Sequence, residues 1–154
     1  MKLLALVPLV SWLVTVFVWA FVYGQRRRDP LNGAFLLFTA AAAGWLTLEL
    51  LFYVPGFEGS EMLILRAVIP FWVSVGFLFL NFAYRLVGRR PDAVFVASCV
   101  ATVLAIVFDL ATDRVLLGFS HHAWGVADVR DPLWHTLVCV VPVFSSLYGL
   151  ILVA

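Results

Sequence analysis

Charged residues are scarce in this sequence, and their scarcity excludes an ordinary water-soluble domain. They make up 12% of the chain and hydrophobic residues 64%, whereas a soluble domain has about 25% and about 45–50%. So few polar side chains cannot cover a water-facing surface. Long apolar blocks separated by short charged clusters are typical of polytopic membrane proteins. The composition therefore predicts an integral membrane protein, with the lipid bilayer as its surroundings.

The sequence lacks the residues that several kinds of binding and catalysis require. Ten Lys and Arg nearly balance nine Asp and Glu, and no basic tract is long enough to neutralise a phosphate backbone, so nucleic acid is not an expected partner. The sequence has no nucleophile with a paired base and no phosphate-binding glycine loop, so we expect no enzyme. The three histidines lack the spacing of a zinc or haem site, so we expect no metal and no cofactor.

Cysteine is also rare. The two cysteines, Cys99 and Cys139, lie inside apolar blocks and not at a zinc or redox spacing. In the topology proposed below they lie toward opposite membrane faces, about 12 Å apart along the membrane normal. A disulfide needs Cα atoms within about 7 Å of each other, so both cysteines are predicted to be packing residues.

Five apolar blocks are each long enough to cross a bilayer. They comprise residues 3–24, 31–53, 62–86, 93–111 and 133–154. Asp-Pro pairs at 29–30 and 131–132 are typical helix starts. The predicted fold class is thus all-α, a polytopic transmembrane bundle with five spans. Residues 112–132 form the only connection with room for structure, and their aromatic residues and glycines predict a short amphipathic cap on the bundle.

Arginines gather on one side of the predicted bundle. They lie in the first and third connections: Arg26, Arg27, Arg28, Arg85, Arg89 and Arg90. Short loops rich in Lys and Arg stay in the cytoplasm, because they resist translocation. We therefore expect the amino terminus outside and a multi-pass protein of the cell inner (plasma) membrane.

Small residues recur at intervals of four and predict close contacts between helices. They are Ala93, Ala97, Ala101 and Ala105 in the fourth block, Ala40 with Gly44 in the second, and Ser145 with Gly149 in the fifth. Packing within one bundle explains these stripes. The alternative is a seam for a homodimer or for a larger membrane complex, and the sequence alone does not separate the two.

Four ionisable side chains lie inside the apolar blocks near their predicted outer ends: Glu49, Arg66, Asp109 and His135. Such residues are costly in a membrane and mark functional sites. Their equal depth on four helices predicts one ligand-binding site that opens outward, with His122 and Trp124 of the 112–132 connection above it. The alternative is that Arg66 only neutralises Glu49 or Asp109 at the boundary, or that each group reaches water separately.

Three segments carry a family resemblance. They are residues 45–49 (WLTLE), residues 79–82 (FLNF) on the block with Arg66, and residues 112–118 (TDRVLLG), followed by Trp124-Gly125 and the helix opening at 132–134. With an outside amino terminus, this pattern resembles the amino-terminal seven-helix membrane region of microbial sensor histidine kinases. The likeness spans essentially the whole chain. The chain departs from the family pattern by ending within the fifth block, without helices six and seven or a PAS, kinase or cyclase domain.

The resemblance implies a function. A stimulus at the outer face would bias the packing of the helices and pass inward as a population shift between two bundle states. The expected function is a membrane-embedded sensory input module of a signal-transduction protein, non-catalytic in itself, with a small ligand at its outer face. The alternative, from another class, is a small accessory subunit that packs against a larger energy-transducing membrane complex.

Cysteine labelling tests the orientation. In a background without Cys99 and Cys139, single cysteines replace Glu58 and Gly88, which lie in connections at opposite ends of the predicted bundle. A membrane-impermeant maleimide should label the Glu58→Cys variant in intact cells and the Gly88→Cys variant only after permeabilisation. Labelling of both variants in intact cells would contradict the predicted topology.

Overall fold

The computed structural model of the chain describes residues 6–25, 29–53, 59–112, 116–122 and 125–154. Its helices are α1 (Leu6–Gly24), α2 (Pro30–Leu51), α3 (Glu61–Leu86), α4 (Ala93–Ala111) and α5 (Pro132–Val153). All five are long and apolar enough to cross a membrane. The predicted class, an all-α polytopic bundle with five spans, is therefore confirmed.

Aspartate side chains cap three of the helices. Asp29 accepts a hydrogen bond from the backbone N–H of Leu31 at the start of α2, and Asp131 caps α5 in the same way. The proline after each of these aspartates occupies the first helical turn, where no intrahelical N–H bond is lost. Asp92 caps α4 without a proline. The helix starts predicted from the two Asp-Pro pairs are confirmed.

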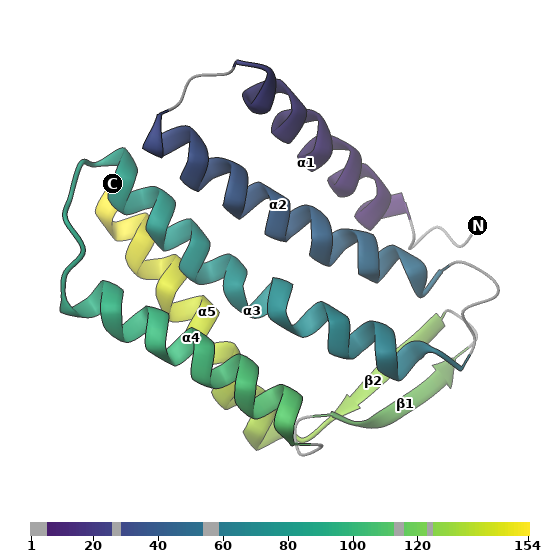
Figure 1. Cartoon of the computed structure of the whole chain (residues 1–154). Helices are drawn as coiled ribbons and strands as arrows, with labels where there is room; N and C mark the ends of the chain where they lie inside the picture. The colour runs from purple at the N-terminus through teal and green to yellow at the C-terminus, as the bar shows by residue number, and fades with distance from the viewer. Residues whose placement is uncertain (1–5, 26–28, 54–58, 113–115, 123–124) are drawn as a thin grey trace.

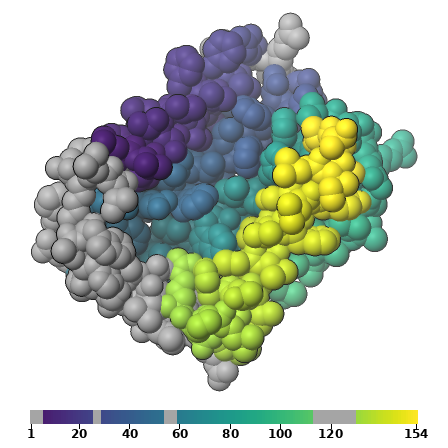
Figure 2. Space-filling view, turned by 180° about the vertical axis from the view of Figure 1, so that it is seen from behind, coloured from purple at the N-terminus to yellow at the C-terminus, as the bar shows by residue number. Residues whose placement is uncertain are grey.

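The helices α1 to α4 lie side by side in chain order, and α5 packs behind α3 and α4 (Figure 1). Figure 2 shows α5 as a ridge on the rear face, with α2 and α3 set back between it and α1. We call the two ends of the bundle the hairpin end, where α4 leads through residues 112–131 into α5, and the Asp92 end, where α3 leads into α4. The amino-terminal end of α1 lies at the hairpin end.

Helix α3 is the centre of the bundle, because it packs against α2, α4 and α5. Its side chains Val73 and Leu80 are fully buried, and Tyr84 is 1% exposed. Helix α1 is peripheral: it packs against α2 and has no buried residue. The indole Nε1 of Trp12 donates a hydrogen bond of 2.7 Å to the Thr47 hydroxyl and ties α1 to α2.

Residues 112–132 contain strands that the sequence analysis did not predict. Strand β1 (Leu116–His122) pairs with β2 (Gly125–Arg130) in an antiparallel sheet, with Leu116 opposite Arg130 and His122 opposite Gly125. This hairpin occupies the place that we predicted for an amphipathic cap (Figure 1). Strand pairing satisfies backbone N–H and C=O groups that a short irregular loop would leave unpaired next to the membrane.

The small-residue stripes differ in what they face. Ser145 is fully buried, and Gly149 lies against Phe79 of α3, so packing within the bundle is confirmed there. In α4 the predicted stripe crosses from the surface to the interior, because Ala93 and Ala97 are exposed whereas Ala105 is buried. The buried face of α4 consists of Ser98, Thr102, Ala105 and Asp109.

Helices α3 and α5 touch through their backbones at Gly76. A Cβ atom on Gly76 would lie 2.3 Å from the carbonyl oxygen of Pro142 and 2.5 Å from its Cα. Membrane helices gain no hydrophobic energy by meeting, so such close approach supplies the packing energy. Pro142 is itself buried inside α5. The contact therefore holds α5 in its position behind α3.

Replacing Gly76 with Ala tests this contact. The added methyl group should force the two backbones apart and lower the free energy of unfolding by about 1–3 kcal/mol, the usual cost of overpacking. Reversible unfolding in mixed detergent micelles measures the change. Gly33→Ala is the control, because nothing lies within 4 Å of a Cβ at that position. Equal stability of the two variants would contradict the described packing.

Candidate functional site

A cluster of polar side chains lies at the hairpin end. It consists of Asp109 near the end of α4, Arg130 at the end of β2, and His135 and Cys139 in the first turns of α5. We call these four residues the hairpin-end cluster. The hairpin leads the chain from α4 back to α5 and so places Arg130 beside both helices. Asp109 is 7% exposed, which is unusual for a carboxylate.

Contacts within the hairpin-end cluster centre on Arg130 and His135. The Arg130 Nη1 atom lies 3.0 Å from His135 Nδ1. One turn further along α5, the Cys139 sulfur lies 3.3 Å from His135 Nε2. The Arg130 guanidinium also interacts electrostatically with the Asp109 carboxylate. Arg130 thus contacts α5 directly and acts on α4 through its positive charge, which offsets part of the cost of burying an acid.

An apolar layer lies directly under the cluster. Its buried residues are Ile69 and Val73 of α3, Ala105 of α4 and Val138 of α5, and we call them the apolar floor. Trp72 packs on this floor, and its ring centroid lies 6.3 Å from that of His135. The floor closes the polar cluster toward the middle of the bundle. Interactions between charges are stronger in such a poorly hydrated site than at an open surface.

The structure places two of the six predicted site residues, Asp109 and His135, at the hairpin end, where each interacts with Arg130. Glu49 is half-buried on α2, and α3 stands between α2 and α4 (Figure 1). Arg66 is exposed on α3. His122 ends β1, but its side chain and all of Trp124 lie outside the described residues. A site shared by all six residues therefore stays a prediction.

Sequence reasoning missed Arg130 and Cys139 as site residues. Arg130 lies in the connection before the fifth block and not inside an apolar block, and Cys139 was predicted to be a packing residue. The spacing of four between His135 and Cys139 puts both on one helix face, and this signal was present in the sequence. Both cysteines are free thiols, consistent with the expectation that they form no disulfide.

The hairpin-end cluster has the donors and acceptors of a binding site. Arg130 offers a forked set of N–H donors suited to a carboxylate or a phosphate, and the imidazole and thiol beside it both donate and accept. Within the described ranges, no group of three or more His, Cys, Asp or Glu residues fits a metal ion. The arrangement suits a small anionic or hydrogen-bonding ligand that competes with Asp109 for Arg130.

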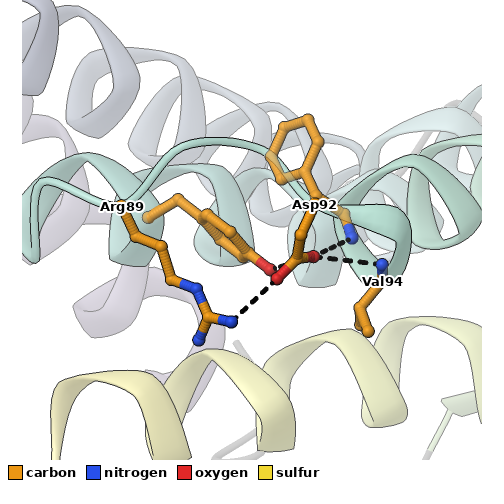
Figure 3. Close-up of polar contacts among 5 residues, drawn as sticks. Arg89, Asp92 and Val94 are labelled. Atoms are coloured by element: carbon orange, nitrogen blue, oxygen red, sulfur yellow. Dashed lines mark hydrogen bonds and ion pairs between the residues drawn. The ribbon is translucent and has the colours of Figure 1, made fainter.

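A second polar group ties the helices together at the Asp92 end (Figure 3). The buried Tyr84 hydroxyl donates a hydrogen bond of 2.6 Å to Asp92 Oδ1. The same oxygen accepts the backbone N–H groups of Val94 and Phe95, and Arg89 lies 3.0 Å from the other carboxylate oxygen. The Tyr84 hydrogen bond, the capping N–H groups and the Arg89 charge hold the pKa of Asp92 below its usual value.

The depressed pKa of Asp92 predicts an acid-dependent stability. A carboxyl group has a pKa of about 3.9 in an unfolded chain. Because the folded value is lower, the stabilisation is present above that pH and is lost as the pH falls through the folded pKa. Unfolding measured from pH 6 downward should show this loss in the wild type and less of it in Asp92→Asn. Parallel curves for the two proteins would contradict the assignment.

Replacing Arg130 with Leu tests the hairpin-end cluster. The substitution leaves the buried Asp109 without its positive neighbour and should lower the free energy of unfolding by about 1–3 kcal/mol. Adding Asp109→Leu to this variant should restore part of the loss. Arg89→Leu is the matched control and should cost less than about 1 kcal/mol, because its ion pair is surface-exposed. Strictly additive effects of the two cluster substitutions would show that Arg130 and Asp109 are not coupled.

Comparison with known proteins adds no family to this description. No protein-family model matches the chain, and no curated protein or solved structure matches it either. The resemblance to sensor histidine kinases therefore remains a prediction from the sequence.

Proposed function

We propose that this chain is the membrane-embedded sensory input module of a signal-transduction protein of the histidine-kinase type, without catalytic activity of its own. The observation that carries the proposal is the hairpin-end cluster, in which one arginine contacts a histidine on α5 and interacts electrostatically with a buried acid on α4. Buried ionisable groups in membrane spans are costly and mark functional sites. The stimulus in this proposal binds at the hairpin end.

The two partners of Arg130 suggest how binding would change the bundle. Asp109 belongs to α4 and His135 to α5, so a small anionic ligand that recruits Arg130 weakens the link between these helices. Such a ligand favours the bundle state in which it binds more tightly and shifts the population toward that state. The change reaches the Asp92 end through α4 and α5, which both extend to it (Figure 1).

The distribution of arginines supports the direction of signalling. Arg85 and Arg89 lie at the Asp92 end, where α1 ends and α2 begins (Figure 1). By the positive-inside rule this end faces the cytoplasm. The hairpin end then faces outward from the inner (plasma) membrane, where a stimulus arrives.

A second candidate, an accessory subunit of a larger membrane complex, is favoured by a different observation. Ala93 and Ala97 are exposed on α4, and α1 has no buried residue. Exposed small residues permit close approach by a helix of another chain. Helices α1 and α4 would then be contact surfaces for neighbouring subunits.

Size and assembly of the native polypeptide decide between the two functions. An antibody against this chain is used on native membranes, by denaturing electrophoresis and by native electrophoresis in mild detergent. The sensory proposal predicts that the sequence is carried in a longer polypeptide that also contains a signalling domain. A polypeptide of 17.1 kDa that migrates with a large complex would refute the sensory proposal and support the subunit.

A further inference from the structure

Three hydroxyl groups in the interior of the bundle have no hydrogen-bond partner among the described residues: Ser98, Thr102 and Ser145. Ser145 is completely buried, Thr102 is 3% exposed and Ser98 is 5% exposed. Other hydroxyls of the chain, such as that of Thr15, bond to the carbonyl of the preceding helical turn. Buried side-chain hydroxyls in proteins are nearly always satisfied, by protein or by ordered water.

Two of the three hydroxyls, those of Ser98 and Ser145, lie at the same depth, and the Thr102 hydroxyl lies nearer the apolar floor. Helices α4 and α5 run in opposite directions, and Ala105 of α4 and Val138 of α5 both belong to the apolar floor. Ser98 lies seven residues from Ala105 on α4, and Ser145 lies seven residues from Val138 on α5. The two serines are therefore at the same depth in the bundle. Seven residues correspond to about 10 Å along a helix, and Thr102 lies between this level and the floor.

Pro142 adds an acceptor to the same region. It lies inside α5 and has no N–H, so the carbonyl of Val138 lacks its usual donor one turn later. In membrane helices, carbonyls freed by proline are satisfied by neighbouring Ser and Thr side chains and by ordered water. The backbone of α3 is in contact with Pro142 at Gly76, which leaves the side facing α4 for such partners.

We propose that buried water binds between α4 and α5 at Ser98, Thr102, Ser145 and the freed carbonyl of Val138, a group that we call the mid-bundle site. A buried water typically makes about three hydrogen bonds, and this site offers four polar groups. The inference does not depend on the proposed function, because it concerns how polar groups inside the bundle find hydrogen-bond partners.

The mid-bundle site lies between the Asp92 end and the apolar floor. Tyr148 follows Ser145 by three residues on α5 and interacts with Tyr84, whose hydroxyl donates to Asp92. In the other direction, the apolar floor separates the mid-bundle site from Asp109. The proposed water therefore lies on the Asp92 side of the apolar floor.

Two substitutions test the mid-bundle site, because bound water and a dry site predict opposite changes in the unfolding constant. Ser145→Ala removes a hydroxyl, and Thr102→Val replaces one with a methyl group of similar shape. If water is bound, each variant loses a hydrogen bond and its unfolding constant rises about threefold, the typical value for a membrane-protein hydrogen bond. If the site is dry, each variant loses an unsatisfied polar group and the unfolding constant falls or stays unchanged, which would overturn the proposal. Reversible unfolding of the full chain in mixed micelles gives the constants.

Two controls bracket this measurement. Thr15→Val makes the same chemical change at a hydroxyl that bonds within its own helix, so the unfolding constant should change less than in Thr102→Val. Ala105→Ser places a new hydroxyl in the apolar floor, where no water is proposed, and should raise the unfolding constant. A stabilising effect of Ala105→Ser would contradict the dry floor.

Radiolytic labelling gives an independent readout. X-ray pulses produce hydroxyl radicals from bound water, which oxidise the side chains beside it. Phe95 and Tyr148, next to the mid-bundle site, should be oxidised in the intact bundle, whereas Phe38 should not. All three rings are half-buried, and Phe38 packs on Phe79 of α3, away from the three hydroxyls. Equal oxidation of Phe38 and Phe95 would contradict a water site confined to the α4–α5 interface.

Discussion

Polar groups inside this bundle must find their partners within the protein, because the hydrocarbon around the helices offers none. The described residues meet this constraint in three ways. Asp92 accepts both a side-chain hydroxyl and the first N–H groups of α4. Asp109 is placed near the guanidinium of Arg130, and the strands β1 and β2 pair their own backbone groups. Where a partner is missing, as at Ser145, the same constraint is the reason for proposing water.

The constraint also explains why α3 is central. A helix that contacts α2, α4 and α5 needs small or well-packed side chains on several faces. Gly76 allows the backbone of α5 to approach, and Tyr84 carries one hydroxyl to the Asp92 end, where it reaches the cap of α4. The apolar floor therefore separates the hairpin-end cluster from the polar groups of the α4–α5 interface and of the Asp92 end.

Features that depend on local sequence were predictable. The lengths of the five apolar blocks gave the spans, and the Asp-Pro pairs gave the starts of α2 and α5. Asp109 and His135 were identified because an ionisable residue inside an apolar block is conspicuous at any position. Arg130 was not identified as a site residue, because its role depends on the β-hairpin that returns the chain to α5. The composition of a short loop does not encode strand pairing.

Which face of each helix is buried was harder to predict than where each helix begins and ends. A membrane helix is apolar all round, so hydrophobic periodicity does not mark its buried face as it does in a soluble helix. For this reason the alanines of α4 were predicted to form one stripe of helix contacts, although Ala97 is exposed and Ser98 is buried. The serine and threonine positions of α4 mark the interior better than its alanines do.

The most direct test of the proposed sensory coupling is a distance measurement between α4 and α5. Spin labels at Val96 and Leu147, which are both exposed, report the separation of the helices in the Asp92 half of the bundle by pulsed electron paramagnetic resonance in lipid nanodiscs. The account predicts that Arg130→Leu, at the other end, shifts the distance distribution while circular dichroism shows the helices intact. Superimposable distributions for the wild type and Arg130→Leu would contradict it.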